Sequence, residues 1–165
     1  MEIRSALPTD LEGIVEVFRT CWNISYRELL PESVRIAMTE EVARGMWQKS
    51  VEIDPDRQTL LAVEGEKVVG VARIGSDPNN AENGHLFSLY VHPEFAGKGI
   101  GSSLLDRALK NLVERGFSRQ TLWVFKDNEV ASKLYKSRGF SYTGAEKIDP
   151  RWQIPEVELI SKLEP

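Results

Sequence analysis

The sequence contains little cysteine and little histidine. Among its 165 residues, Cys21 is the one cysteine, and His85 and His92 are the two histidines. A single cysteine excludes an internal disulfide framework. Cys21 lies between Thr20 and Trp22 in an amphipathic helix pattern, where a cysteine usually acts as a small buried hydrophobic residue rather than as a nucleophile. We expect no bound metal.

The sequence also lacks a basic tract and a long apolar run. Its 25 acidic residues outnumber the 21 basic ones, which gives a net charge of −4 and a pI near 5.3. This balance argues against nucleic acid as the main partner. No apolar stretch reaches membrane-spanning length, and residues 1–4 show no signal-peptide core. We therefore predict a cytoplasmic protein that forms one domain over residues 1–165.

What the sequence does contain is a turn with three alternate glycines. An apolar strand pattern ends at Val91, a turn marked by Pro93 follows, and a helix pattern begins at Ile100. Alternate glycines let a ligand approach the backbone amides, and amides at a helix N-terminus attract an anion. We therefore predict that residues 97–102 bind a phosphate. The alternate glycines are Gly97, Gly99 and Gly101.

Two common phosphate-binding loops fit this turn poorly. The dinucleotide loop needs glycines at its first, third and sixth places, but the sixth place counted from Gly97 is Ser102. The nucleoside-triphosphate loop needs a Gly-Lys pair followed directly by Ser or Thr, and Lys98 is followed by Gly99. The glycines alone leave the ligand open, so the segments after them decide.

A second pattern lies downstream of the glycine turn. Residues 121–125 form an apolar strand pattern, and a helix pattern begins after Asn128, which can cap it. Gly139 is placed to end that helix. The predicted inner stripe of the helix consists of Val130, Ala131, Leu134 and Tyr135.

Together the two patterns resemble the GCN5-related N-acetyltransferase superfamily, usually called GNAT. In that family the motif R/Q-x-x-G-x-G/A holds the pyrophosphate of acetyl-coenzyme A (acetyl-CoA), and Gly99-Ile100-Gly101 matches its second half. The first motif position is Ala96 here, so the contact is expected to rest on backbone amides, with help from Lys98 and Ser102. The family's N-x-x-A-x-x-x-Y-x-x-x-G-F pattern is matched in full by Asn128, Ala131, Tyr135, Gly139 and Phe140.

The order of the predicted elements suits the GNAT fold. The resemblance implies an α/β (mixed α+β) fold with a central mixed, mostly antiparallel sheet of about six to seven strands, flanked by about four helices. A capping box at Thr9–Glu12 predicts the start of the first helix, and Thr39 can cap another. Residues 25–38 are expected to hold a turn or two of helix, and residues 77–84 a polar loop. The predicted strands cover residues 3–7, 58–63, 67–74, 85–91, 121–125, 141–148 and 156–163.

The resemblance implies that an amine attacks the acetyl carbonyl directly, without a covalent enzyme intermediate. Tyr135 takes the place of the family's acid, since a phenol with a pKa of about 10 is protonated at neutral pH and can donate to the departing thiolate. Its spacing alone favours an aromatic residue packed on the inner face of the helix, and the motif residues in register with it favour the acid instead. His85 at the start of the central strand, or Glu82 in the loop before it, could act as a base through water. His85 could also be a solvated strand-end histidine, and His92 is expected to be exposed.

The same resemblance implies where the cofactor lies. In GNAT enzymes the pantetheine arm enters between the central strand and the next, which splay apart. Backbone groups at Leu89 and Val91 would bond the arm like an added strand, and Asn128 would contact it besides capping its helix. The predicted cofactor-binding residues are Leu89, Tyr90, Val91, Ala96, Gly97, Lys98, Gly99, Ile100, Gly101, Ser102, Asn128 and Tyr135.

The acceptor pocket is expected to involve the first helical region. Residues 22–31 resemble the W-x-x-x-Y-x-x-L-L-P stretch of a common bacterial GNAT branch whose acceptors are mostly unassigned. Trp22 and Tyr26, with Glu28 nearby, could hold a cationic amine, and they could equally be core residues. Trp123, on the strand after the glycine-rich turn and its helix, could border the same site.

The predicted function is therefore an acetyl-CoA-dependent N-acetyltransferase, an acyltransferase that acts on a primary amine of a small molecule or a peptide. A non-catalytic acyl-CoA sensor is the alternative, and it would keep the glycine turn and Asn128 without needing Tyr135 or an acceptor pocket. The missing sixth glycine argues more firmly against a nucleotide-binding oxidoreductase. GNAT proteins often form dimers, so a homodimer is an open expectation. The identity of the acceptor is open as well.

Overall fold

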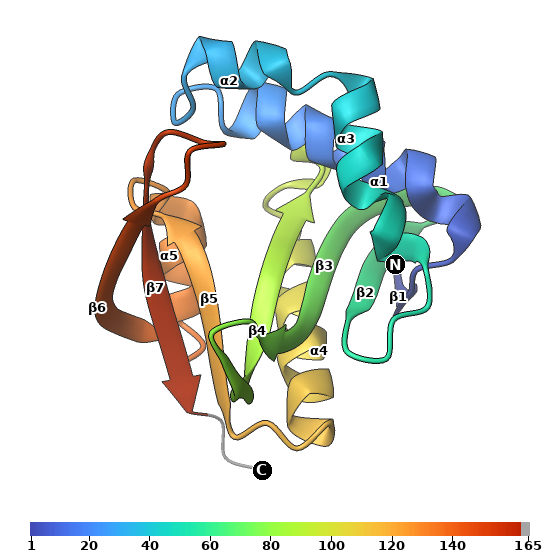
Figure 1. Cartoon of the computed structure of the whole chain (residues 1–165). Coiled ribbons are helices and arrows are strands. Elements are labelled where there is room, and N and C mark those ends of the chain that lie inside the picture. The colour runs from blue at the N-terminus through green and yellow to red at the C-terminus, as the bar shows by residue number, and fades with distance from the viewer. Residues whose placement is uncertain (163–165) are drawn as a thin grey trace.

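A seven-stranded sheet forms the middle of the molecule, for which the computed structural model describes residues 1–162 (Figure 1). The strands are β1 (Glu2–Ser5), β2 (Gln58–Glu64), β3 (Lys67–Asp77), β4 (Asn80–Val91), β5 (Arg119–Phe125), β6 (Ser141–Ile148) and β7 (Pro155–Lys162). They lie in the order β1-β2-β3-β4-β5-β7-β6, and within the described residues only β4 and β5 pair in parallel. The predicted mixed, mostly antiparallel sheet is therefore confirmed.

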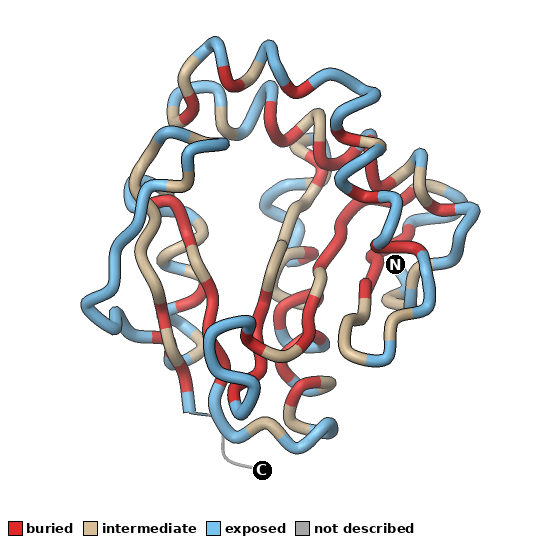
Figure 2. Tube along the Cα trace, in the orientation of Figure 1, coloured by how far each residue is buried: buried red, intermediate tan, exposed pale blue. Residues whose placement is uncertain are grey.

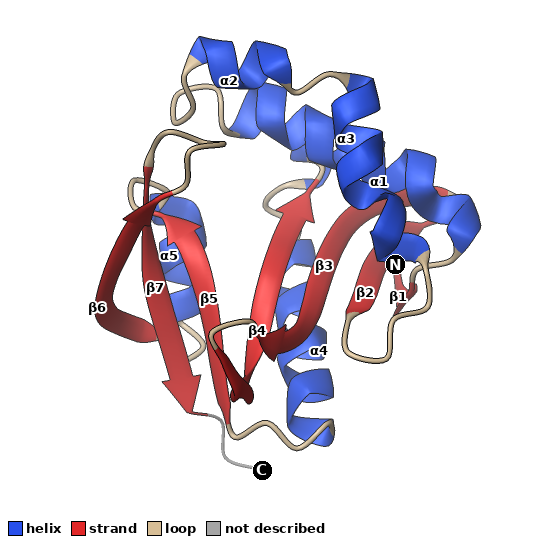
Figure 3. Cartoon of the chain, in the orientation of Figure 1, coloured by secondary structure: helices blue, strands red, loops and turns tan. Residues whose placement is uncertain are grey.

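In residues 1–162, five α-helices cover the two faces of this sheet (Figure 3). On one face lie α1 (Leu11–Thr20), α2 (Glu32–Ala37) and α3 (Glu40–Trp47). On the other lie α4 (Ile100–Glu114) and α5 (Glu129–Lys136). The sequence predicts about four helices, and the additional one is α2, a six-residue helix inside the stretch 25–38 that is expected to hold only a turn or two.

The core forms two layers, one on each side of the sheet. Strand β2 shows the alternation, because Leu61 and Val63 join the layer under α1–α3 whereas Leu60 and Ala62 join the layer under α4–α5. Successive side chains of a strand point to opposite faces, so an apolar run such as this one supplies both layers. Figure 2 shows burial concentrated in the central strands, while the edge strand β6 is exposed along its length.

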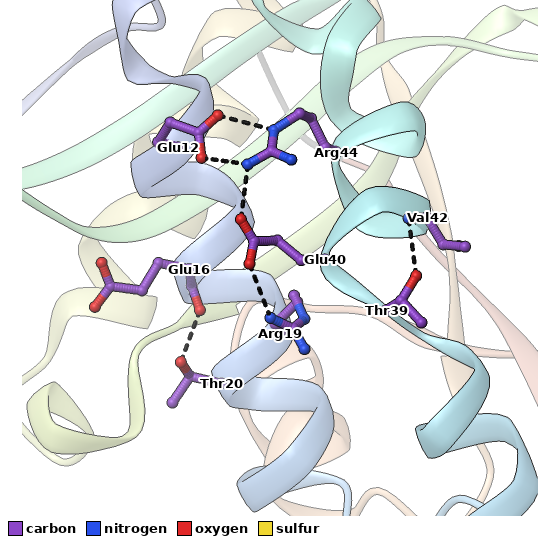
Figure 4. Close-up of polar contacts among 8 residues, drawn as sticks. All are labelled: Glu12, Glu16, Arg19, Thr20, Thr39, Glu40, Val42 and Arg44. Atoms are coloured by element: carbon purple, nitrogen blue, oxygen red, sulfur yellow. Dashed lines mark hydrogen bonds and ion pairs between the residues drawn. The ribbon is translucent and has the colours of Figure 1, made fainter.

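Helices α1 and α3 are joined at their surface by a network of ion pairs (Figure 4). Arg44 donates to both carboxylate oxygens of Glu12, at 2.9 and 2.7 Å, and to Glu40 at 2.8 Å. Arg19 approaches the same Glu40 at 3.8 Å. Thr39 caps α3 as predicted, since its hydroxyl accepts from the amide of Val42 at 3.2 Å. Exposed pairs of this kind add little stability, but they fix the register of the two helices.

The predicted capping box at Thr9 and Glu12 is wrong. A 3₁₀ turn, η1 (Pro8–Asp10), precedes α1, and the Asp10 carboxylate accepts from the Leu7 amide at 2.7 Å. Arg4 donates to both oxygens of Asp10 at 2.8 Å, and this contact lowers the pKa of Asp10 although partial burial opposes the shift. Asp10 therefore stabilises the start of this helix in place of Thr9, because its carboxylate accepts hydrogen bonds both from the preceding turn and from Arg4 on β1.

The predicted polar loop at residues 77–84 is also wrong. Strand β3 continues to Asp77 and β4 begins at Asn80, so a tight turn joins them. The carboxylate of Asp77 accepts from the amide of Asn79 at 2.8 Å, which lets a polar sequence close a hairpin. His85 consequently lies inside β4 rather than at its start.

The face pattern of β4 differs from simple alternation. Two consecutive residues of β3 pair with Ser88 and Leu86, so Phe87 is an extra residue in the ladder. Leu89 therefore shares the α4–α5 layer with Leu86 instead of the face of His85. The rings of His85 and Phe87 remain adjacent, with their centroids 4.7 Å apart. A local irregularity of this kind bends the strand at the point where it leaves β5.

Boundaries elsewhere differ by few residues. Strand β1 ends at Ser5 although the sequence predicts 3–7, whereas β6 covers the predicted 141–148. Strand β7 ends at Lys162, and the predicted strand end at Leu163 lies outside the described residues. Residues 1–162 contain no helix with the length and hydropathy needed to cross a membrane.

Candidate active site

Strands β4 and β5 pair over a short stretch and then diverge (Figure 1). Their parallel ladder joins residues 84–86 to residues 120–122. Beyond it, β4 continues against β3 as far as Val91, and β5 continues against β7 as far as Phe125. The facing edges of the two strands therefore keep backbone groups that an extended ligand can bond. The divergence that the resemblance implies is present.

A cavity of about 340 Å³ lies at this divergence. Its walls include Trp47 from the core layer under α1–α3 and Tyr135 from the layer under α4–α5. Since these layers lie on opposite faces of the sheet, the cavity reaches through it. The predicted site residues that line it are Trp22, Tyr26, His85, Leu89, Tyr90, Trp123, Asn128 and Tyr135.

The wall on the α1–α3 side is aromatic. The ring of Trp22 lies 5.0 Å from that of Phe18 and 5.0 Å from that of Trp152, and Tyr90 meets Phe18 at 5.2 Å. A π-helical turn, η2 (Cys21–Ser25), precedes Tyr26, whose amide bonds back to the carbonyl of Cys21. Such turns occur often at functional sites. Trp22 is 1% exposed, so it is both a core residue and part of the cavity wall.

Tyr135 reaches the cavity from α5. Its ring packs 6.0 Å from that of Phe140, and burial alone raises the pKa of its hydroxyl above the usual value. The hydroxyl is therefore protonated across the physiological pH range. Val130 does not share this inner stripe, because its side chain is 82% exposed, and the prediction for it is wrong.

Asn128 begins α5 and also lines the cavity. Its side-chain oxygen accepts from the amide of Ala131 at 3.2 Å, which confirms the predicted helix cap. The cap holds the first turn of α5 against the divergence of β4 and β5, so the residue positions Tyr135 two turns later on the same helix.

The glycine turn has the geometry of an anion-binding nest. Gly97 and Gly99 have φ angles of 75° and 78°, and Gly99 is the residue from which α4 begins. Left-handed glycines next to a helix N-terminus direct successive amides to one point. A β-carbon added at Gly101 would meet Val91 and Leu134 at 3.6 and 3.7 Å, so the start of α4 lies against the end of β4 and against α5.

The residues around the nest differ in exposure. Ala96, Gly97, Lys98 and Gly99 are exposed, and Ser102 is half-buried. Ile100 is 2% exposed in the core, so only its backbone is available to a ligand. The ammonium of Lys98 lies over the ring of Phe95, 4.7 Å from its centroid. None of the residues 96–102 lines the cavity, which places the nest outside it, beyond the end of β4.

His85 belongs to a buried polar chain. Its Nδ1 lies 2.7 Å from the hydroxyl oxygen of Thr121, which donates to Asp77 at 2.5 Å. Because that hydroxyl has one proton and gives it to Asp77, its oxygen accepts from Nδ1–H, and Nε2 keeps a lone pair. Burial lowers the pKa of His85 to about 4; Asp77 opposes this shift, and Lys147 and Arg57 add to it. His85 is thus neutral at physiological pH.

The other predicted polar residues lie apart from the cavity. Glu82 is exposed near the start of β4, and Glu28 is exposed after η2; neither lines the cavity. Val91 is half-buried at the end of β4. Its backbone carbonyl accepts a hydrogen bond from the thiol of Cys21 at 3.0 Å. Burial raises the pKa of that thiol to about 12, in keeping with the predicted inert cysteine. His92 is 5% exposed, so its predicted exposure is wrong.

Several charged residues of the cavity wall were not predicted from the sequence. Arg73 interrupts the apolar run of β3, which is a signal that the sequence offers. Glu156 on β7 gives no such signal; burial raises the pKa of its carboxyl group. The cations in the wall are Arg57, Arg73, Lys147 and Arg151, and the carboxylates are Asp149 and Glu156.

Metal-ligating side chains do not gather in this part of the molecule. Residues 1–162 contain no group of three or more His, Cys, Asp or Glu side chains that could hold a metal ion.

Known proteins with similar sequences cover most of the chain. A family model described as the acetyltransferase (GNAT) family matches residues 12–140. An uncharacterized N-acetyltransferase of Archaeoglobus fulgidus is 32% identical over 144 residues, which make up 84% of this chain and 91% of that protein. An acetyltransferase of Pectobacterium atrosepticum is 28% identical over 141 residues, or 82% of this chain and 84% of its own length.

Solved structures share the whole architecture. The PaiA N-acetyltransferase of Thermoplasma acidophilum, crystallised with coenzyme A, superposes with a TM-score of 0.79 over 98% of both chains at 24% identity. The ribosomal-protein-alanine N-acetyltransferase of Brucella melitensis superposes with a TM-score of 0.78 over 99% of this chain and 100% of its own, at 21% identity. Structural similarity at these levels of sequence identity establishes the fold alone.

Proposed function

Because this chain belongs to the GNAT acetyltransferase family, we propose that it moves the acetyl group of acetyl-CoA to a primary amine held in the cavity between β4 and β5. The observation that carries the proposal is the cavity, which runs from the aromatic wall through the sheet to Tyr135. Two substrates can approach one point from opposite faces of such a passage. This favours an enzyme over an acyl-CoA sensor, which would need no space for an acceptor.

The α4 side suits acetyl-CoA, which brings the thioester whose carbonyl carbon is attacked. Its pyrophosphate would lie at the nest of Gly97–Ser102, where glycines leave the amides accessible and the helix dipole favours negative charge. Its amide-containing arm would bond the free edge of β4 at Leu89 and Val91, as a strand adds to an open sheet. The similar structure from Thermoplasma acidophilum, crystallised with coenzyme A, supports the choice of this cofactor.

The acceptor amine must be neutral when it attacks. His85 lines the cavity, and its Nε2 has a free lone pair. With a pKa of about 4, this nitrogen can accept a hydrogen bond from the amine but is a weak base for removing the proton. Glu156 is the better proton acceptor, since burial raises the pKa of its carboxyl group above its usual value whereas burial lowers that of His85. We therefore assign orientation of the amine to His85 and removal of its proton to Glu156, and we assign neither role to the exposed Glu82.

The attack is direct. The one thiol of the chain belongs to Cys21, whose pKa of about 12 leaves it protonated and whose hydrogen is donated to the Val91 carbonyl. A thiol in that state is a poor nucleophile. The collapse of the tetrahedral adduct releases the thiolate of coenzyme A, and we assign its protonation to Tyr135, which lines the cavity.

The proposal is tested with two measurements on the whole chain. Native mass spectrometry should detect a complex with acetyl-CoA, and a thiol-release assay over a panel of primary amines should detect coenzyme A formed only when an acceptor is present. A chain that binds acetyl-CoA but releases no thiol with any amine would contradict the enzymatic proposal and leave the sensor.

Thr121 is expected to set the orientation and tautomer of His85. Thr121→Val removes the hydroxyl that links Asp77 to Nδ1, so the imidazole loses its fixed donor side. We expect the 15N spectrum of His85 to change from a protonated Nδ1 to a mixture of tautomers. We expect kcat to fall by roughly tenfold, less than the 10²–10⁴-fold of a direct acid–base group, because Thr121 acts only through His85.

Thr121→Ser is the matched control, because it keeps the hydroxyl and loses one methyl group. It should retain both the tautomer and the rate. An unchanged spectrum in Thr121→Val, or equal losses of rate in both variants, would show that Thr121 has only a packing role.

Ala96 stands where the family usually has Arg or Gln, so Ala96→Arg should add a contact to the pyrophosphate. The position is exposed and its backbone, with φ −62° and ψ 152°, accepts any side chain. A charge-assisted hydrogen bond contributes about 1.5–3 kcal/mol, which predicts roughly tenfold tighter binding or more in calorimetry. The gain should shrink at high salt.

Ala145→Arg adds the same charge on the exposed edge strand β6 and should leave the affinity unchanged. Equal or weaker binding by Ala96→Arg would mean that the loop takes a different path around the phosphates.

A further inference from the structure

The cavity has an excess of positive charge in a protein whose net charge is −4. Four cationic side chains and two carboxylates line it, and one carboxylate, Asp149, is already bonded to Arg151 at 2.6 Å. Within residues 1–162, the side chains of Arg57, Arg73 and Lys147 form no salt bridge, whereas Arg151 in the same wall and five arginines elsewhere do. Three cationic side chains without a salt bridge therefore face one cavity, where an anionic ligand could pair with them.

Two of these cations lie close together. Burial lowers the pKa of Arg73, and the neighbouring charge of Arg57 lowers it further. Arg57 lies over the ring of Phe87, 4.3 Å from its centroid, and Lys147 lies over the ring of Trp123 at 4.2 Å. Aromatic stacking fixes the position of such groups without neutralising them. Asp54 is close enough to favour the charge of Arg73, but it forms no salt bridge with either arginine, and burial together with Arg57 outweighs it. A bound anion would therefore stabilise the two guanidinium groups further.

Unsatisfied buried polar atoms point to the same ligand. Buried polar groups in proteins are nearly always hydrogen-bonded, so exceptions need an explanation. Of the seven buried side-chain atoms that have no partner within the described residues, four belong to the cavity wall. Three are donors, on Arg73, Trp22 and Trp47, and one is an acceptor, on Glu156. A complementary ligand offers several acceptor oxygens and one cationic or N–H group.

The two kinds of group lie on opposite sides of the divergence. Arg73 is on β3, and Arg57 directly precedes β2, whereas Glu156 is on β7, beyond β5. A molecule that contacts both sides must lie across the point where β4 and β5 separate. We propose that the acceptor is an amine that also carries a carboxylate, with the carboxylate bound by Arg57 and Arg73 and the amine directed to Glu156. This inference rests on the proposed function and specifies its substrate class.

The arrangement also helps the chemistry. Neighbouring positive charges lower the pKa of a bound ammonium group, so Arg57, Arg73 and Lys147 favour the neutral nucleophile. A polyamine, which carries several positive charges and no carboxylate, would be repelled by the same three groups. The cations are not placed to hold the phosphates of the cofactor, because Arg73 pairs with Ser88 inside the sheet whereas the nest lies beyond the end of β4.

The test compares acceptors that differ only in the carboxylate. Each amine is assayed as the free L-amino acid and as its carboxamide, with spermidine as the polycation, and kcat/KM is measured by thiol release. A charge-assisted contact predicts that at least one amino acid is preferred over its amide by about 10-fold to 100-fold. Equal or better turnover of the amides or of spermidine would overturn the inference while leaving the proposed function intact.

Variants then assign the preference to the two arginines. In Arg57→Gln and Arg73→Gln the preference for the carboxylate should fall by about tenfold, mainly through KM, while calorimetric affinity for acetyl-CoA is unchanged. Arg119→Gln, which alters an exposed arginine at the start of β5, is the matched control and should keep the preference. Arg73→Gln should unfold at the same or a higher temperature, since it relieves the repulsion from Arg57. A preference that survives in both cavity variants would overturn the assignment.

A binding measurement separates failure of this inference from failure of the proposed function. N-acetyl-L-phenylalanine and its carboxamide are titrated by calorimetry into the protein with coenzyme A present. Tighter binding of the acid, lost in Arg73→Gln, supports the carboxylate site even if no amine is acetylated. Binding of neither compound, combined with turnover of amines that lack a carboxylate, refutes the site and retains the enzyme.

Discussion

Tyr135→Phe should reduce turnover by about 10²–10⁴-fold while acetyl-CoA binds as tightly as before. The substitution removes one hydroxyl and keeps the ring that packs on Phe140. The pKa of this hydroxyl is raised by burial and by nothing else, so it remains protonated over the whole working range of pH. A buried, protonated hydroxyl that lines the cavity is suited to donate to a departing thiolate. A hydroxyl that only packed there would cost almost no rate.

The measurement is single-turnover release of coenzyme A in parallel with calorimetric binding of acetyl-CoA. Tyr142→Phe removes the same group from the exposed face of β6 and should change neither value. If turnover of Tyr135→Phe stays within a few-fold of the parent, Tyr135 is a packing residue. The thiolate must then take its proton from water.

Local patterns in the sequence predicted the elements that depend on neighbours in the chain. Helix α5 is an example, because it is capped by Asn128 directly before it, and the left-handed Gly139 lies three residues after its last residue, Lys136. The nest at Gly97 and Gly99 is another, since a left-handed residue at a helix start is a property of the backbone there. These are also the segments that carried the family resemblance, which explains why the backbone of the glycine turn and of α5 was predicted more completely than the cavity wall.

Features that depend on distant partners could not be predicted in the same way. The position of His85 inside β4 follows from a hairpin closed by Asp77, and its tautomer follows from Thr121 on β5. The face of the sheet to which the Leu89 side chain points is set by a single extra residue in the β3–β4 ladder. Glu156 becomes relevant only because β7 lies next to β5, a neighbour out of chain order. Spacing along the sequence contains none of these pairings.

The predicted exposure of two residues is wrong, for opposite reasons. Val130 has the spacing of the inner stripe of α5, but it lies in the first turn and its side chain is exposed. His92 follows the last residue of β4 and accepts from the amide of Glu94 at 3.3 Å, so a polar turn residue becomes a buried cap. In both cases the position of the helix or turn end in the folded protein decides whether the side chain is exposed, and the local sequence pattern does not.

Gly101→Glu should weaken acetyl-CoA binding on the order of 100-fold while the fold is kept. Two unit charges about 4 Å apart near a protein surface repel by about 4 kcal/mol at an effective dielectric constant of about 20, and part of this is lost to screening. Gly101 is the second residue of α4, and its β-carbon would make ordinary contacts with Val91 and Leu134. An acidic residue in a first helical turn stabilises the helix, so lost binding cannot be attributed to unfolding.

Two controls separate charge from size and from global effects. Gly101→Gln has nearly the same volume without the charge, and we expect it to lose roughly tenfold less affinity than Gly101→Glu. Gly45→Glu places the same charge on α3, where an added β-carbon meets no atom within 4 Å, and it should bind acetyl-CoA as the parent does. Affinity that is unchanged in Gly101→Glu would move the pyrophosphate away from the N-terminus of α4. The left-handed conformation of Gly97 and Gly99 would then have another cause than phosphate binding. Glycine adopts that conformation with less strain than any other residue type.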